Sequence, residues 1–152
     1  MIVTEILFVC TGNTCRSAMA EAIARDVFCD KADALRFVSR GINVMMPSRA
    51  TPDAIRAVQS EYSIDMNNHL ARALSEADLR HADLVLAMTG EHKHYLLYVY
   101  PAFADKIFTL SEYTGTPGGN VNDPYGMDAS TYKNCAKELR GYIEKLATAL
   151  EA

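Results

Sequence analysis

Apolar runs of strand length alternate with helical segments along this chain of 152 residues. Residues 2–9 and 82–88 form nearly continuous apolar stretches, which are typical of strands buried on both faces. Residues 35–39 and 106–110 complete the set of expected strands. Strands that are separated by helices pair in parallel, and the connecting helices cover the sheet. The sequence therefore predicts an α/β fold with a four-stranded parallel sheet flanked by helices on both faces.

The segments between these strands carry helix signals. Ser17 is a suitable N-cap for a first helix, and Pro52 suits the first position of a second helix. Shorter helices are expected from residue 75 and over residues 91–98. A long helix is expected from residue 128, because apolar side chains recur there every three or four residues.

Length and composition exclude several classes of protein. A net charge of −4 gives the chain no electrostatic attraction to nucleic acid, and no stretch reaches the roughly 18 consecutive apolar residues of a membrane span. The N-terminus lacks the basic region of a signal peptide. Four cysteines are typical of a reduced compartment rather than of a disulfide framework. We therefore expect a single cytoplasmic domain over residues 1–152, with neither a nucleic-acid nor a membrane partner.

The first expected strand is joined to the first helix by the loop Cys-Thr-Gly-Asn-Thr-Cys-Arg-Ser. Ligands of parallel sheets bind beyond the carboxyl ends of strands, which is where Cys10 is expected. The loop amides and the helix N-terminus can surround a tetrahedral oxyanion, and Arg16 adds a two-pronged donor. The same groups favour the thiolate of Cys10, to which Ser17 can donate a hydrogen bond. Gly12 and Asn13 tolerate the positive φ that turns N–H groups inward.

A nucleophilic thiol inside an anion-binding loop is suited to phosphoryl transfer through a cysteine. The leaving group of that reaction needs a proton donor. Residues 114–127 form a loop with four glycines and two prolines, and a loop of this length is a candidate for function. The loop contains Asp123, whose carboxyl group can approach the leaving atom from the side opposite Cys10, and Pro124, which stiffens the approach. An Asp-Pro pair is also a common turn, so this signal is weak when it is taken alone.

On these motifs the chain resembles the low-molecular-weight protein tyrosine phosphatases over nearly its full length. The resemblance covers the cysteine loop, the strand over residues 82–88 and the Asp-Pro-Tyr segment. It implies the fold of that family and three catalytic roles. Cys10 attacks phosphorus, Arg16 binds the equatorial oxygens, and Asp123 acts first as general acid and then as general base.

The resemblance also implies supporting roles. Asn13 and Ser17 hold the loop and the thiolate, and His69 buttresses the asparagine. The phosphate-binding loop of the resemblance comprises Thr11, Gly12, Asn13, Thr14, Cys15 and Ser17. Two positions depart from the family pattern. Arg40 puts a charge where the family usually has alanine, and the aromatic residue common in the following pocket loop is absent from residues 43–46.

Thr14 and Tyr125 are the expected determinants of specificity, and Tyr125 is the clearest aromatic wall for a substrate. Tyrosine phosphatases of this family commonly carry a branched aliphatic residue at the position of Thr14. The chain is similar to a bacterial subgroup, the protein arginine phosphatases, in its complete cysteine loop and in Gly126. The hydroxyl of Thr14 makes the pocket less suitable for an apolar ring and can form a hydrogen bond with a guanidinium. The carboxylate of Asp123 would pair with the same planar cation. The expected substrates are proteins phosphorylated on arginine, and phosphotyrosine is the alternative.

A cysteine at the position of Cys15 can form a disulfide with the nucleophile in this family, which protects it from over-oxidation. The resemblance therefore implies a reversible Cys10–Cys15 bond. No metal or other cofactor is expected, because Arg16 and the loop amides supply positive charge. A thiol-relay arsenate reductase of the same fold would need two further cysteines in mid-chain, and none lies between Cys29 and Cys135.

Other conspicuous side chains are expected to have structural roles. Residues 92–94, His-Lys-His, suit a solvated helix turn better than a metal site, and residues 45–47 suit either the core or an apolar lip of the pocket. Packing is expected for Cys29, Cys135, Tyr95, Tyr98, Tyr100 and Tyr113. A binding module without catalysis is disfavoured because the cysteine, arginine and aspartate are all present. A monomer or weak homodimer is expected.

Overall fold

Four parallel strands form the centre of the computed structural model, which describes residues 3–151. The strands are β1 (Glu5–Cys10), β2 (Arg36–Gly41), β3 (Leu84–Ala87) and β4 (Ile107–Thr109), in the spatial order β2-β1-β3-β4. Each neighbouring pair runs parallel. The predicted α/β fold with a four-stranded parallel sheet is confirmed. Residue 2 of the first expected strand lies outside the described residues, and the strand begins at Glu5.

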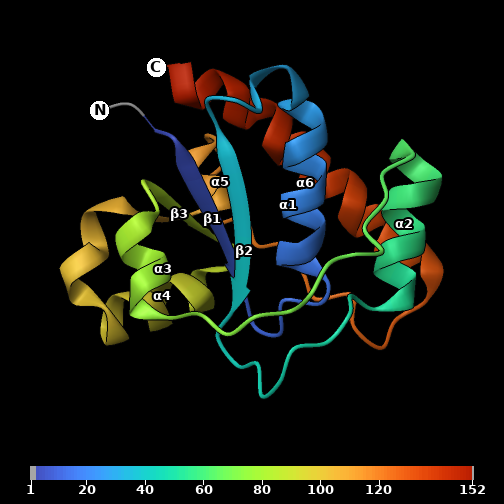
Figure 1. Ribbon diagram of the computed structural model, residues 1–152, viewed down its shortest axis with the longest axis horizontal. Helices are drawn as coiled ribbons and strands as arrows, with labels where there is room; N and C mark the ends of the chain where they lie inside the picture. Colours follow the sequence, from blue (N-terminus) through green and yellow to red (C-terminus); the bar gives the residue numbers. More distant parts are fainter. Residues whose placement is uncertain (1–2, 152) are drawn as a thin grey trace.

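Helices cover both faces of this sheet (Figure 1). One face is covered by α1 (Arg16–Val27), α2 (Pro52–Tyr62) and α6 (Ala129–Glu151). The other face is covered by α3 (Glu76–His81), α4 (Gly90–Val99) and the 3-10 helix Pro101–Lys106. The short α5 (Leu110–Tyr113) follows β4, and a second 3-10 helix, Cys29–Lys31, follows α1. Among residues 3–151, no helix combines the length and the apolar character that crossing a membrane requires.

Side chains of β1 alternate between two hydrophobic layers, as the pleat of a strand requires. Ile6 and Phe8 pack with α1, α2 and α6, whereas Leu7 and Val9 pack with α3, α4 and their neighbours. All four side chains are fully buried. The nearly continuous apolar run in the sequence is thus explained, because both faces of the strand are covered.

One helix cap and one short helix differ from expectation. Ser17 is not the N-cap of α1: Cys15 takes that position, and Ser17 is buried within the first turn. The hydroxyl of Ser17 is directed to the sulfur of Cys10 instead. The helix α5 was not expected, although Thr109 and Glu112 form a capping box whose Thr-x-x-Glu pattern is visible in the sequence.

The two cysteines outside the loop have different environments. Cys135 is buried in α6, as expected, and burial raises the pKa of its thiol to about 12. Cys29 is exposed, so the packing role expected for it is wrong. The reason is local, since α1 ends at Val27 and Phe28 turns into the core, which leaves Cys29 on the outer side of the following turn.

The tyrosines do not form a packed cluster. Tyr100 and Tyr113 pack against the two hydrophobic layers, as expected. Tyr98 is 84% exposed and Tyr95 is also exposed, so packing is wrong for these two. Both lie on α4, which directs Leu96 into the core.

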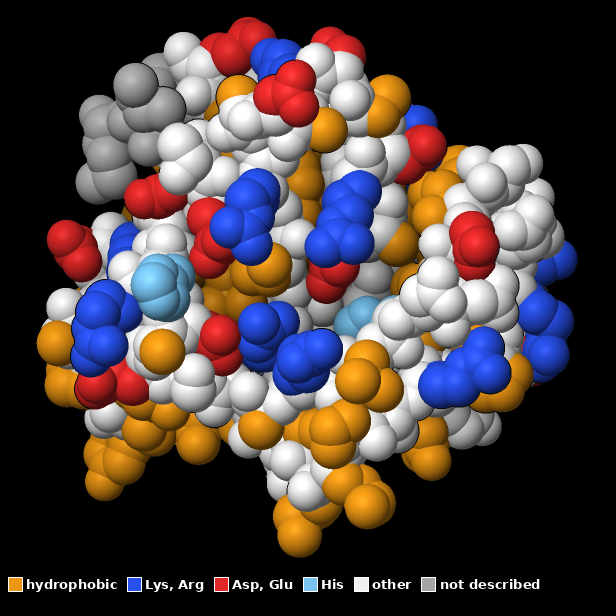
Figure 2. All heavy atoms as spheres, viewed as in Figure 1, with side chains coloured by type: hydrophobic (Ala, Val, Ile, Leu, Met, Phe, Trp, Pro, Cys, Tyr) orange, Lys and Arg blue, Asp and Glu red, His pale blue; other side chains and the backbone are white. Residues whose placement is uncertain are grey.

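The loop after β2 presents two exposed methionines. Met45 is 93% exposed and Met46 is 73% exposed, so of the two alternatives left open for them the core is wrong. They line a hollow of about 360 Å³ beside Arg40 and Arg72. Figure 2 shows hydrophobic side chains along the lower edge of this face, where Figure 1 places the loop between β2 and α2.

Alanine is expected to have opposite effects at Gly41 and Gly141. A Cβ on Gly41 would lie 2.8 Å from the carbonyl oxygen of Thr11 and 3.0 Å from the nitrogen of Asn13, both backbone atoms. We expect Gly41→Ala to lower the free energy of unfolding by about 1–3 kcal/mol. Gly141 lies inside α6 with open space around it, so Gly141→Ala should raise that free energy by about 0.5–1 kcal/mol. Urea denaturation measures both, and an undiminished stability of Gly41→Ala would contradict the close approach.

Candidate active site

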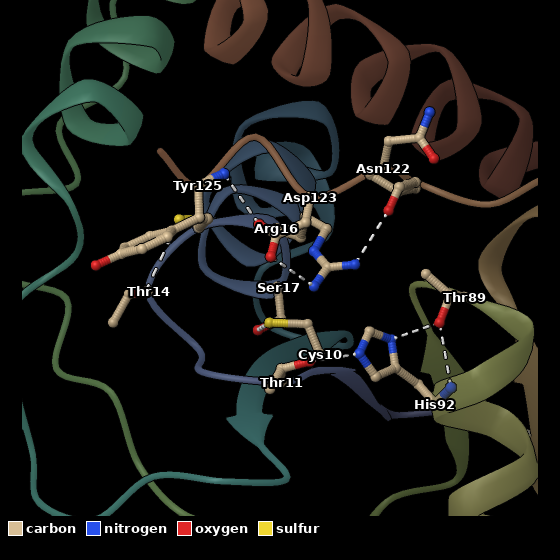
Figure 3. A network of polar contacts seen from close by, with 12 residues as sticks. Cys10, Thr11, Thr14, Arg16, Ser17, Thr89, His92, Asn122, Asp123 and Tyr125 are labelled. Atoms are coloured by element: carbon tan, nitrogen blue, oxygen red, sulfur yellow. Dashed lines mark hydrogen bonds and ion pairs between the residues drawn. The ribbon is translucent and has the colours of Figure 1, made fainter. Parts of the chain in front are cut away.

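The loop between β1 and α1 lies at a switch point of the sheet. Because β1 is paired with β2 on one side and with β3 on the other, a crevice opens beyond its carboxyl end. A cavity of about 200 Å³ lies there, lined by residues 10–16, Asp123 and Tyr125. Residues 10–17 are called the phosphate loop below. The two motifs that lie far apart in the sequence are thus brought to one cavity, as expected (Figure 3).

Cys10 is the last residue of β1 and is only 2% exposed. Its sulfur accepts a hydrogen bond from the N–H of Asn13 at 3.3 Å and lies 2.9 Å from Oγ of Ser17. The Asn13 side chain donates to the same Oγ at 2.8 Å, which leaves the hydroxyl hydrogen of Ser17 free to point at the sulfur. These donors and the N-terminus of α1 stabilise a negative sulfur. Asn13 and Ser17 therefore lie where a nucleophilic thiolate needs them.

Asn13 is the most constrained residue of the phosphate loop. It is fully buried with a φ of 57°, which asparagine tolerates better than most residues. Its Oδ1 accepts from the N–H of Arg72 at 3.0 Å, its carbonyl oxygen accepts from Nε2 of His69 at 2.7 Å, and its Nδ2 also donates to Ser39 at 2.9 Å. His69 thus contacts the asparagine as the resemblance implies. Gly12 has no positive φ, so that expectation is wrong, and Asn13 alone makes the left-handed turn.

The hydrogen bonds behind the loop continue further than the sequence indicated. Ser39 donates to Glu21 at 2.6 Å, and Glu21 pairs with Arg25 at 2.8 Å. The missed signal is spacing, since Ser17, Glu21 and Arg25 follow one another at intervals of four residues and share one face of α1. A continuous path of hydrogen bonds therefore runs from the Cys10 sulfur to a carboxylate that is balanced by an arginine.

Arg16 is buried and faces Asp123 across the cavity (Figure 3). Its Nη1 donates to the carbonyl oxygen of Val121 at 3.2 Å, and its Nη2 lies 3.6 Å from Oδ2 of Asp123. The Asp123 side chain is 53% exposed, so solvent screens this ion pair and it contributes little stability. The N–H of Tyr125 donates to Oδ1 of Asp123 at 3.0 Å, and the Tyr125 side chain is largely exposed. Arg16 is thus held in place, while the carboxylate is free to exchange partners.

Cys15 and Cys10 are both free thiols. The Cys15 sulfur lies 3.3 Å from Oγ1 of Thr51 and 3.7 Å from the hydroxyl of Tyr132. Burial raises the pKa of Tyr132 to about 12, so this hydroxyl keeps its hydrogen and can donate to the sulfur. Thr14 lines the cavity, and its carbonyl oxygen accepts from the N–H of Thr51 at 3.1 Å. The Cys10–Cys15 bond stays a prediction.

His92 does not belong to a solvated helix turn, so that expectation is wrong. It is only 7% exposed, with Nε2 2.9 Å from Oγ1 of Thr11 and Nδ1 2.9 Å from Oγ1 of Thr89. Burial first, and then the charge of Arg16, lower the pKa of His92 to about 4, against the opposing effect of Asp123. The missed signal is Thr89, an N-cap that fixes His92 in the first turn of α4 directly after β3. Among residues 3–151, no group of three or more potential ligand side chains is arranged to hold a metal ion.

Comparison with known proteins places this geometry in a family. The model of the low molecular weight phosphotyrosine protein phosphatases matches residues 5–152. The chain is 37% identical over 147 residues to a protein-arginine-phosphatase of Bacillus subtilis, and the aligned region covers 97% of each chain. It is 45% identical to the low molecular weight protein tyrosine phosphatase of T. tengcongensis, with a TM-score of 0.91 and coverage of 95% of this chain and 98% of that one.

A second similar structure is a YwlE arginine phosphatase mutant with a phosphorylated active-site serine. It is 38% identical, with a TM-score of 0.91 and coverage of 97% of this chain and 96% of that chain. The similarity to these proteins in sequence and in fold agrees with the cysteine loop and with the cavity above it. The chain belongs to the family of low molecular weight phosphotyrosine protein phosphatases.

Proposed function

We propose that this chain is a cysteine-dependent phosphatase that removes phosphate from arginine side chains of proteins. The observation that carries the proposal is Thr14 in the wall of the cavity that also contains Asp123. A hydroxyl and a carboxyl group suit a planar guanidinium, because oxygens of both accept hydrogen bonds from it. An apolar ring would offer the Thr14 hydroxyl no hydrogen bond beyond its weak contact with the Cys15 sulfur at 3.8 Å. The similar proteins that are named arginine phosphatases support the same substrate.

In the first step of the proposed reaction, the thiolate of Cys10 attacks phosphorus and an S–P bond forms. The P–N bond of phosphoarginine breaks, and the nitrogen takes its electron pair together with a proton from Asp123. Arg16 and the loop amides hold the three phosphoryl oxygens, where negative charge is concentrated. The burial of Arg16 supports this role, since a guanidinium held in place needs little reorganisation.

In the second step, water attacks the phosphocysteine and gives a proton to the carboxylate of Asp123. The S–P bond breaks, phosphate leaves, and the electron pair returns to sulfur as a thiolate. The hydrogen bonds of Ser17 and of the Asn13 N–H support this step, because they stabilise the leaving sulfur. The similar structure with a phosphorylated active-site serine supports a covalent intermediate at this position.

Phosphotyrosine is the alternative substrate, and the same cysteine chemistry would serve it. Tyr125 favours this alternative because its exposed ring lies at the cavity and can stack on a phenyl ring. The similar tyrosine phosphatase of T. tengcongensis favours it too. For either substrate, we propose that residues 1–152 act as one cytoplasmic domain, as a monomer or weak homodimer, on phosphorylated proteins. The small number of cysteines in the sequence, four in 152 residues, supports a reduced compartment.

Substitution of Thr14 tests the substrate. Thr14→Val removes the hydroxyl at nearly constant volume, and Thr14→Ile adds a methylene to that change. We expect both to lower kcat/KM on a phosphoarginine peptide relative to a phosphotyrosine peptide, by about tenfold for one lost hydrogen bond. Side-by-side turnover of the two peptides measures this ratio. Cys10→Ser, which should be inactive on both, controls for contaminating phosphatases, and an unchanged ratio for both Thr14 variants favours the tyrosine phosphatase.

Oxidation tests the role proposed for Cys15. Peroxide converts the Cys10 thiolate to a sulfenic acid, and attack by the Cys15 thiol then forms a disulfide and releases water. We expect wild type to regain most of its activity when a thiol reductant follows peroxide, whereas Cys15→Ser is over-oxidised and regains much less. Cys29→Ser, at an exposed cysteine outside the cavity, is the matched control. Equal recovery of Cys15→Ser and wild type would rule out the protective disulfide.

A further inference from the structure

His92 joins α4 to the phosphate loop through both of its ring nitrogens (Figure 3). Nε2 contacts Oγ1 of Thr11, which lines the cavity, and Nδ1 contacts Oγ1 of Thr89 at the start of α4. The ring is nearly buried, so these contacts are not exchanged freely for water. None of the roles assigned so far uses this side chain.

The contacts that Thr89 already makes favour one direction for these hydrogen bonds. Its Oγ1 accepts a hydrogen bond from the backbone N–H of His92 at 3.1 Å. If Nδ1 carried the proton, Thr89 would accept twice and its own hydrogen would have neither ring nitrogen as partner. With the proton on Nε2, Thr89 donates to Nδ1 and His92 donates to Thr11. This assignment is consistent with a neutral ring, whose pKa burial and Arg16 lower to about 4.

A Thr11 oxygen that accepts from His92 keeps its own hydrogen for another partner. Thr11 is exposed on the cavity wall beside Cys10, so a phosphoryl group bound in the cavity can supply that partner. We infer that His92 is a positioning residue that orients the hydroxyl of Thr11 as a hydrogen-bond donor to the phosphoryl group above Cys10. This inference rests on the proposed phosphatase function and adds a donor to the loop amides and Arg16.

The neutral state of His92 has a measurable consequence for stability. Its pKa is about 4 in the folded chain, whereas 6.5 is its ordinary value. Between these two values the unfolded chain binds a proton that the folded chain does not, so the stability contributed at neutral pH is lost as pH falls from about 6.5 towards 4. We expect the melting temperature of His92→Gln to fall less than that of wild type over this range. If the melting temperatures of wild type and His92→Gln fell equally with pH, that result would contradict a neutral buried imidazole influenced by Arg16 and Asp123.

Two amide substitutions of His92 distinguish the contact of its Nε2 from the contact of its Nδ1. Glutamine can place its Nε2 near the position of the histidine Nε2 and keep the bond to Thr11, whereas asparagine reaches only Thr89. We expect His92→Asn to lower kcat/KM on p-nitrophenyl phosphate and to weaken inhibition by vanadate, each by about tenfold. His92→Gln should lose about threefold at most. Equal losses in the two variants would overturn a role for Nε2.

Thr11 itself gives the second arm of the experiment. We expect Thr11→Val to match the loss of His92→Asn, and Thr11→Ser to lose less than Thr11→Val because it keeps the hydroxyl. In the Thr11→Val background, His92→Asn should cause no further loss of kcat/KM, although it still lowers the melting temperature. A full additional loss would overturn the inference. A wild type without turnover would refute the phosphatase proposal instead, which keeps the two failures distinguishable.

Discussion

A buried amide side chain must find hydrogen-bond partners within the fold, because each polar group left unpaired costs on the order of 1–3 kcal/mol. The side chain of Asn13 finds them in its own loop, at Ser17, and on two segments that are distant in sequence, at Ser39 and Arg72. Its left-handed backbone turns the loop around the sulfur of Cys10. The shape of the phosphate loop is therefore held by contacts with the core of the fold.

The two halves of the site differ in how firmly they are held. Cys10 and Arg16 are buried, and hydrogen bonds from or to the backbone fix them. Asp123 is half exposed and is held by the Tyr125 N–H and by a screened ion pair. This difference suits the proposed reaction. The oxyanion must be met by a fixed set of donors, whereas the carboxyl group must follow the leaving atom in one step and water in the next.

Local signals predicted the parts of this molecule that depend on local patterns. Apolar runs gave the strands of the sheet, and the cysteine loop with Asp123 gave the two walls of the cavity. The errors concern residues whose environment depends on tertiary packing. Cys29 is exposed because Phe28 takes the inward direction at the end of α1. His92 reaches the site because the strand order places β3, and with it the start of α4, beside β1. Glu21 is linked to the site through Ser39 of β2, a contact that its spacing on α1 alone does not specify.

The charge state of His92 also fits the demands on its neighbours. A protonated imidazole would repel Arg16, and it would attract the carboxylate of Asp123 that the proposed mechanism needs for proton transfer. Burial and the charge of Arg16 remove that proton, so the ring offers a hydrogen bond without a competing charge. In the proposed reaction the guanidinium of Arg16 supplies positive charge to the phosphoryl group, and neutral donors complete the hydrogen bonds of that group. Asp123 is thereby left as the group whose proton changes during the reaction.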